Sequence, residues 1–325
     1  MPWTSPSPMV ATIQDTETAD VEDLPPRPVV PKPAPPARIG RYLVVRELGR
    51  SRTGVVYEAR DPGRRRPVAI KMSSAGRAAT VELEARFLFE ACALLRLAHP
   101  AIVRAYDIGR HDGGLFFVMD CVQGPTLAQR LRRDPPDLAE SLRIAAAVAR
   151  GLHHAHRRGL VHRDIKPQNV VLTRAMQPRI IDFGIAMDLD EGIGPREGRI
   201  LGTPGYMAPE QSAGGTHAVG PAADIYALGA VLHHLLAGRA RFHDAGAHGI
   251  LSTVKQHALP ALPALASGIP GAVERLCRRA VARDPAQRHA SALELARDLE
   301  RCLHQERARL PALGVRSTAT DTGDA

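Results

Sequence analysis

His162-Arg163-Asp164-Ile165-Lys166-Pro167-Gln168-Asn169 is the stretch that decides how the rest of the chain is interpreted. It places a carboxylic acid, an amine and an amide within six residues of one another, at Asp164, Lys166 and Asn169. Apolar runs precede and follow it, and both are typical of short buried strands (160–161 and 170–172). We therefore expect a polar loop that the core holds at both ends.

The composition is that of a globular protein with a sizeable core. The chain has 325 residues, of which 44% are hydrophobic, enough for one large domain or for two lobes that share an interface. The net charge of +9 and the pI of about 9.9 would also suit a nucleic-acid-binding protein. The arginines, however, are spread through helical patterns and no basic platform with aromatic residues is present. We therefore expect a solvated basic surface and no nucleic-acid partner.

The four cysteines lie far apart in the sequence, at Cys92, Cys121, Cys277 and Cys302. No pair has the Cys-x-x-Cys spacing, so we expect reduced thiols rather than disulfides or a zinc site. The N-terminus lacks the charged start and apolar core of a secretory signal, and no apolar run approaches the roughly 18 residues of a membrane span. These features predict a soluble, cytoplasmic protein.

Both ends of the chain differ in character from the middle. Residues 1–38 are rich in proline, with acidic and hydroxylated residues between, and have neither helical nor strand periodicity. This composition predicts a disordered, partly polyproline-like tail, which is either a solvated leader or a docking segment for a proline-recognising partner. Residues 309–325 turn polar and aperiodic, and they predict a second disordered tail.

Alternating apolar residues dominate the first part of the folded region. They predict strands and hairpin turns over 42–48, 55–60, 67–72, 102–108 and 115–119. Apolar residues at helical spacing predict one helix over 80–97. From Gly124 onward the pattern is mainly helical, with a long loop over 182–210 and helices over 126–133, 138–158, 224–236, 250–256, 272–282 and 290–302.

Further motifs lie at defined places in this pattern. A glycine-bearing turn, 48–56, separates the first two strands, and Val68-Ala69-Ile70-Lys71 lies on the third strand. Asp182-Phe183-Gly184 follows an apolar strand and begins 13 positions after Asn169. Three more stretches follow in order: Gly202-Thr203-Pro204-Gly205-Tyr206-Met207-Ala208-Pro209-Glu210, Asp224-Ile225-Tyr226-Ala227-Leu228-Gly229 and Asp284-Pro285-Ala286-Gln287-Arg288.

Taken together, these motifs resemble the catalytic domain of protein serine/threonine kinases of the bacterial, eukaryotic-like type, over about residues 41–303. The resemblance implies an α+β fold of two lobes with ATP between them. The small lobe (39–122) would hold five antiparallel strands and one helix, and the large lobe (123–308) would be mainly helical. It also implies that Asp224 holds the catalytic loop from below, and that Glu210 pairs with Arg288.

The resemblance also implies a nucleotide site. Lys71 would bind the α- and β-phosphates, with a glutamate of the following helix as its partner. Three glutamates compete for that role, and we choose Glu90 over Glu82 and Glu84 because it shares a helical face with Phe87 and Leu94. The nucleotide would contact the glycine-rich loop, the strand that carries Lys71, a gatekeeper at Met119, the hinge after it and one residue beyond the catalytic loop. The residues expected at these places are Leu48, Gly49, Ser51, Gly54, Val56, Ala69, Lys71, Met119, Asp120, Val122 and Val171. Ser51 stands where the family has glycine, so we expect weakened closure over the phosphates.

For the chemistry, the resemblance implies that Asp164 accepts the proton of the substrate hydroxyl while Lys166 steadies the transferred phosphoryl group. Asn169 and Asp182 would hold Mg²⁺, with Mn²⁺ as the alternative metal. Lys166 together with Thr203 is similar to the pattern directed to Ser and Thr, so the expected function is phosphorylation of Ser/Thr in protein substrates, with autophosphorylation. The alternatives are a nucleotide-binding pseudokinase scaffold, which only Ser51 supports, and a small-molecule phosphotransferase, which would not need the Ala208-Pro209-Glu210 element.

The loop before Ala208 raises a question of regulation. Between Gly184 and Ala208 its only hydroxylated residues are Thr203 and Tyr206, so the usual phosphorylation site is missing. The resemblance makes Arg163 the receiver of such a phosphate. Glu197 would then offer Arg163 a permanent carboxylate, or it is a solvated loop residue.

Overall fold

A computed structural model of the chain describes residues 34–50, 54–63, 66–73, 81–183, 186–188, 203, 205–212, 219–238 and 268–313. Contacts divide the chain into two units, Met1–Pro35 and Pro36–Ala325, and the fold below is that of the second unit. The predictions for the proline-rich tail, a helix over 250–256, Ser51 and Glu197 lie outside the described residues, apart from the last few residues of that tail.

The first part of the second unit is a six-stranded antiparallel sheet with the order β1-β2-β3-β4-β6-β5. Its strands are β1 (Arg38–Ile39), β2 (Tyr42–Arg50), β3 (Gly54–Arg60), β4 (Pro67–Ser73), β5 (Ala105–His111) and β6 (Gly114–Asp120). The expected α+β fold with an antiparallel small lobe is confirmed. Strand β1, which pairs with β2, was not predicted, because two residues are too few to show an alternating pattern.

The prediction of a strand over 102–108 was wrong at its start, since β5 begins at Ala105. Ile102 instead forms a parallel bridge with Ile180, a residue of the later part of the chain. Strand β5 then runs on to a tight turn at Asp112 and Gly113, where both residues have positive φ angles of 49° and 78°. Two such residues in a row give the type I′ geometry that matches the twist of paired strands.

Helix α1 (Val81–Leu95) packs on this sheet. Its inward face contributes Phe87, whose ring lies 5.2 Å from that of Phe117 on β6, and both side chains are fully buried. The same face carries Glu90, which is also buried. Helical spacing thus brings an acidic side chain beneath the sheet among apolar neighbours.

The second part is mainly helical and contains two small two-stranded sheets, β7 with β10 and β8 with β9. Helix α5 lies in its core, and nearly all of its residues are buried, as expected of a helix that is apolar on every side. The elements are α2 (Leu127–Arg133), α3 (Leu138–His156), β7 (Leu160–Val161), η1 (Pro167–Asn169), β8 (Val170–Leu172), β9 (Pro178–Ile180), β10 (Met187–Asp188), α4 (Pro209–Ser212), α5 (Pro221–Ala237), α7 (Gly271–Ala280), η2 (Pro285–Gln287) and α8 (Ala292–Leu313).

The last helix, α8, is longer than predicted. We expected a helix that ends at residue 302 and an aperiodic tail from residue 309, but α8 continues to Leu313. The residues after Cys302 are good helix formers, and no glycine or proline occurs among them before Pro311. Loss of apolar periodicity there therefore marked the end of the buried face, not the end of the helix.

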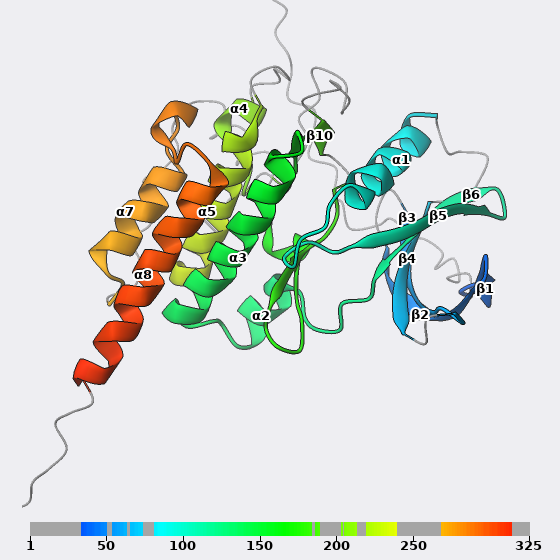
Figure 1. Cartoon of the computed structure of the whole chain (residues 1–325), viewed down its shortest axis with the longest axis horizontal. Helices are drawn as coiled ribbons and strands as arrows, with labels where there is room; N and C mark the ends of the chain where they lie inside the picture. The colour runs from blue at the N-terminus through cyan, green and yellow to red at the C-terminus, as the bar shows by residue number, and fades with distance from the viewer. Residues whose placement is uncertain are drawn as a thin grey trace, which may run out of the picture. The chain divides into compact units, whose positions relative to one another are not determined.

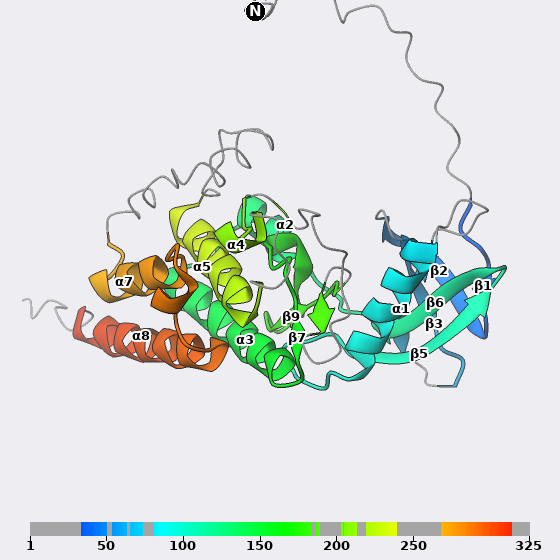
Figure 2. The ribbon, with the colours of Figure 1, turned by 90° about the horizontal axis from the view of Figure 1, so that it is seen from above.

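Figure 1 shows the strands of the large sheet grouped with α1, apart from α3, α5, α7 and α8, which pack side by side. Figure 2 shows the same two groups from above, with β7 and β9 on the side of the helical group that is nearest α1. Within the described part of the chain, no helix is both long enough and apolar enough to span a bilayer.

Candidate active site

The loop between β7 and β8 is held in place by one buried carboxylate. Asp224 of α5 is completely buried and accepts the backbone N–H groups of His162 (2.8 Å) and Arg163 (2.7 Å). The Nε2 atom of His156 also lies 2.8 Å from its Oδ2 atom. Burial alone would raise the pKa of Asp224, but the hydrogen bonds and charge of its histidine partners hold that pKa below its usual value.

Two residues of this region adopt the left-handed backbone conformation, which is uncommon for residues other than glycine. They are Arg163, with φ of 69°, and Asp182, with φ of 66°. The backbone around Arg163 is held by the Asp224 carboxylate and by the Gln211 side chain, which donates to the Arg163 carbonyl at 2.9 Å. Such strained residues persist only where their surroundings over-determine the conformation, as at functional sites.

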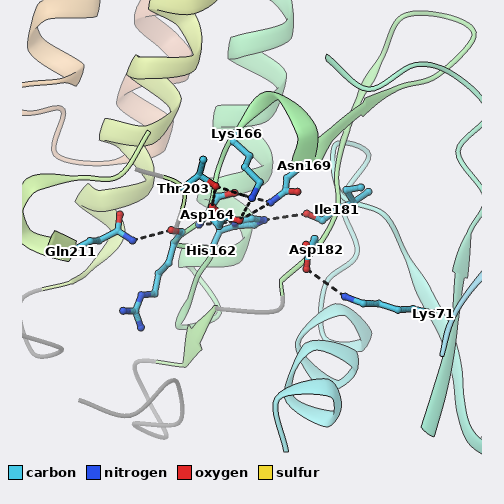
Figure 3. Close-up of polar contacts among 10 residues, drawn as sticks. Lys71, His162, Asp164, Lys166, Asn169, Ile181, Asp182, Thr203 and Gln211 are labelled. Atoms are coloured by element: carbon cyan, nitrogen blue, oxygen red, sulfur yellow. Dashed lines mark hydrogen bonds and ion pairs between the residues drawn. The ribbon is translucent and has the colours of Figure 1, made fainter. Parts of the chain in front are cut away.

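Asp164, Lys166 and Thr203 form a closed ring of hydrogen bonds (Figure 3). The Lys166 ammonium donates to Asp164 Oδ2 at 2.6 Å and to the Thr203 hydroxyl at 2.8 Å, and that hydroxyl donates to Asp164 Oδ1 at 2.9 Å. Asn169 adds bonds from Nδ2 to the Asp164 carbonyl (2.9 Å) and carboxylate (3.2 Å). The Asp164 side chain therefore has a defined orientation while remaining 14% exposed.

Lys71 of β4 meets a buried acid and a more exposed one. Its ammonium donates to both carboxylate oxygens of Glu90, at 2.6 and 2.7 Å, and lies 3.5 Å from Asp182 Oδ1. Glu84, which competed with Glu90 in the sequence, instead lies 4.0 Å from Arg110. Burial would lower the pKa of Lys71, but the two carboxylates raise it, so the ammonium stays charged.

Asp182 and Asn169 suit a hard divalent cation. The Asp182 side chain is 41% exposed and presents carboxylate oxygens near the Lys71 ammonium. The amide nitrogen of Asn169 is engaged by Asp164, which leaves the amide oxygen as the atom available for a cation. Carboxylate and amide oxygens are the ligands that Mg²⁺ takes together with substrate phosphates, so these residues fit such an ion.

The residues expected to contact a nucleotide come from the large sheet and from β8. Ala69 and Met119 are register partners on β4 and β6, and Val56 is the register partner of Lys71. Val171 of β8 bridges to Thr126 at the start of α2. The other expected residues that the structure describes lie on β2, β3 and β6 and just after β6, namely Leu48, Gly49, Gly54, Asp120 and Val122.

Three supporting residues were missed by sequence reasoning. His156 contacts the buried Asp224 carboxylate. The His162 ring packs at 4.6 Å on the Phe183 ring, and its Nε2 atom lies 3.3 Å from the Ile181 carbonyl. The third residue, Gln211, bonds to Arg163. No sequence signal marks these contacts, because each partner lies 19 to 68 positions away.

A second buried ion pair is formed by Arg288 and Glu210. Arg288 has no exposed side-chain area and donates to both oxygens of Glu210, at 2.7 and 2.8 Å. It also donates to the carbonyls of Ala222, Ala282 and Arg283. This arrangement joins the start of α4 to the segment after α7.

Comparisons with known proteins agree with this geometry. The protein kinase domain family matches residues 42–299. Among curated proteins, the chain is 34% identical to the serine/threonine-protein kinase PknL of Mycobacterium tuberculosis, over 80% of this chain and 65% of that protein. It is 34% identical to PrkC of Bacillus subtilis over 82% of this chain and 41% of that one.

A solved structure is also similar. The kinase domain of Mycobacterium tuberculosis PknI superposes with a TM-score of 0.64 at 34% identity, covering 81% of this chain and 96% of that domain. The chain spans 65% or less of the length of PknL and PrkC. Since the family match extends over most of the chain, and the fold and relatives agree with it, the chain belongs to the protein kinase domain family.

Proposed function

We propose that the chain transfers the γ-phosphoryl group of ATP to Ser and Thr hydroxyls of protein substrates. A protein kinase domain implies ATP, a divalent metal and protein substrates. The observation that carries the proposal is the ring of Asp164, Lys166 and Thr203. It holds a partly exposed carboxylate in one orientation beside a cation, as an acceptor for a hydroxyl proton requires.

In the proposed mechanism, Asp164 accepts the proton of the attacking hydroxyl, and Lys166 balances charge on the transferred group. Lys71, whose position is set by Glu90, binds the nucleotide phosphates from the other side. Asp182 and Asn169 would hold a divalent cation, for which we propose Mg²⁺. When bound, this ion supplies positive charge that neutralises the phosphate oxygens.

Thr203 supports the choice of acceptor. Its hydroxyl both accepts from Lys166 and donates to Asp164, so it orders the two groups nearest the attacking oxygen. This compact arrangement is suited to a short aliphatic hydroxyl. A phenolic hydroxyl lies at the end of a long ring and would have to approach from farther away.

The proposal is tested with three peptides that differ only in carrying Ser, Thr or Tyr as the acceptor. We expect Mg-ATP-dependent phosphate on the Ser and Thr peptides and at least about tenfold less on the Tyr peptide, measured by mass spectrometry of the products. A peptide with Ala at that position is the control. Phosphate on the Tyr peptide alone, or ATP hydrolysis without peptide phosphorylation, would contradict the proposal.

The buried Lys71–Glu90 pair predicts a pH dependence. Burial raises the pKa of Glu90 to about 7, against the opposing charge of Lys71. Below that pH Glu90 is neutral and holds Lys71 less firmly, so kcat/KM for ATP should fall by up to about tenfold per pH unit. Asp182 also raises this pKa. The negative charge of Asp182 would be offset if the residue held a cation in the complex with ATP, so the fall in kcat should lie at lower pH than the fall in kcat/KM.

The raised pKa of Glu90 affects stability in the opposite direction from activity, because it favours the folded state at low pH. Since the folded pKa of Glu90 lies above the unfolded value of 4.5, the folded state binds the proton more tightly. This contribution to stability is complete below pH 4.5 and is lost as the pH rises through about 7.

A Glu90→Gln variant tests the pH dependence of activity, and it should lose the acidic limb of kcat/KM. If its pH profile kept the same limb, Glu90 would not be the titrating group.

A further inference from the structure

A basic cavity lies where the end of α3 meets the segment that follows α1, and none of the residues that line it belongs to the candidate active site. Its volume is about 360 Å³. Six of the seven residues that line it are basic and the seventh is Leu293 of α8, so no carboxylate is among them: His99, Arg150, His153, His154, Arg157 and Arg158. The histidines and arginines come from the end of α3 and from the segment that follows α1. Figure 1 shows α3 beside α8, which supplies the leucine.

Contacts between these side chains set the shape of the cavity. The rings of His99 and His154 lie 5.2 Å apart and so join the segment after α1 to α3. The Arg158 guanidinium lies 3.2 Å from both the carbonyl and Nδ1 of His154. Leu293 is the apolar residue that lines the cavity. The basic side chains that line the cavity therefore come from two separate parts of the chain, the end of α3 and the segment that follows α1.

The positive charge in the cavity exceeds what its surroundings balance. Glu300 pairs with Arg150, at 2.6 and 2.7 Å, and the carbonyl end of α3 supplies about half a negative charge. Three arginines thus leave an excess of roughly 1.5 positive charges before any histidine is protonated. The Arg157 side chain makes no hydrogen bond or ion pair with any described residue. A single arginine at the carbonyl end of α3 would be explained by its favourable interaction with the helix dipole, but three arginines are not.

Both burial and the positive charge act on the pKa values of the histidines in this cavity. Burial first, and then neighbouring positive charges, lower the pKa values of His99, His153 and His154. The charges that act on His99 are those of His154, Arg150, Arg179 and Arg158, and all of them push in the same direction. An anion in the cavity would reverse this effect, because it favours the protonated rings.

We propose that this cavity binds a phosphoryl-type dianion. Guanidinium groups donate paired hydrogen bonds that match the oxygens of phosphate groups, and imidazole N–H groups add further donors. A dianion balances the excess charge. The volume equals that of about a dozen water molecules, which accommodates a diphosphate or a phosphorylated side chain with a few waters.

The test is calorimetric titration of the purified full chain with inorganic pyrophosphate and with a short phosphothreonine peptide, without metal and at constant ionic strength. The test variant is Arg157→Ala with Arg158→Ala. Arg132→Ala with Arg133→Ala is the matched control. These two exposed arginines lie in the last turn of α2, and replacing them removes the same charge. Thermal unfolding of both variants checks that each is folded.

We expect the test variant to lose at least about tenfold in affinity for one binding event, and the control to match the unmodified chain. Tighter binding of pyrophosphate would identify a free anion as the ligand, and tighter binding of the peptide would identify a protein-borne phosphoryl group. Equal losses in both variants would reveal only a general effect of charge and overturn the proposal. Binding that neither variant changes would also overturn it.

Discussion

Replacing Asp164 with Asn is expected to lower kcat for peptide phosphorylation by roughly 10²–10⁴-fold, the usual contribution of a general acid or base. Asparagine keeps the size of the side chain and can still accept the hydrogen bond from Thr203. It cannot take up the hydroxyl proton, and it loses the charge that faces Lys166. ATP affinity should change little, because the phosphates meet Lys71. Steady-state kinetics and nucleotide titration measure the two effects separately.

Asp112→Asn is the matched control for this substitution. Asp112 lies in the turn between β5 and β6 with an 80% exposed side chain, and asparagine tolerates its positive φ angle. This variant should keep the activity of the unmodified chain. If Asp164→Asn also kept it, the observed phosphorylation would come from a contaminating kinase, and the chain would be a nucleotide-binding scaffold.

Replacing Arg288 with Met is expected to lower the free energy of unfolding by about 3–5 kcal/mol. The loss arises because the Glu210 carboxylate, only 10% exposed, would keep its charge without its partner. The carbonyls of Ala222, Ala282 and Arg283 would also lose a donor. Urea denaturation followed by circular dichroism measures the change.

A surface ion pair and a double variant complete this experiment. Arg278 lies 2.6 Å from Glu274 on α7, but its side chain is 66% exposed, so Arg278→Met should cost no more than about 1 kcal/mol. Combining Arg288→Met with Glu210→Gln should destabilise less than the sum of the two single changes, because neither charge is then left unpaired. Additive effects would contradict the proposed coupling.

Much of the fold could be predicted because its patterns are local. Alternation over five or six residues located β3, β4 and β6, and helical spacing located α1 and α3. The two errors had different causes, distant pairing in one case and local helix propensity in the other. Ile102 looked like the first residue of a strand, yet it pairs with Ile180. At the other end, α8 continued after its buried face had ended.

The residues of the candidate site that could be predicted are likewise those whose pattern is local. Residues 162–169 were recognisable because the spacing of Asp164, Lys166 and Asn169 resembles that of the protein kinase catalytic loop, with the other kinase motifs following in order. The choice of Glu90 also came from the sequence, because positions one helical turn apart share a face. Each of these inferences spans a single element, in which backbone geometry determines the direction of the side chain.

By itself the sequence, through its resemblance to protein kinases, indicated the two-lobed fold and the place of the catalytic loop at residues 162–169. Only the tertiary structure decided that Gln211 and His156 help Asp224 to hold that loop, since these two residues lie 48 and 68 positions from their partners. The tertiary structure also decided that His99 joins the histidines and arginines of α3 in one cavity. The physical reason is the same in both cases: such contacts depend on how separate elements pack against each other, which no local periodicity records.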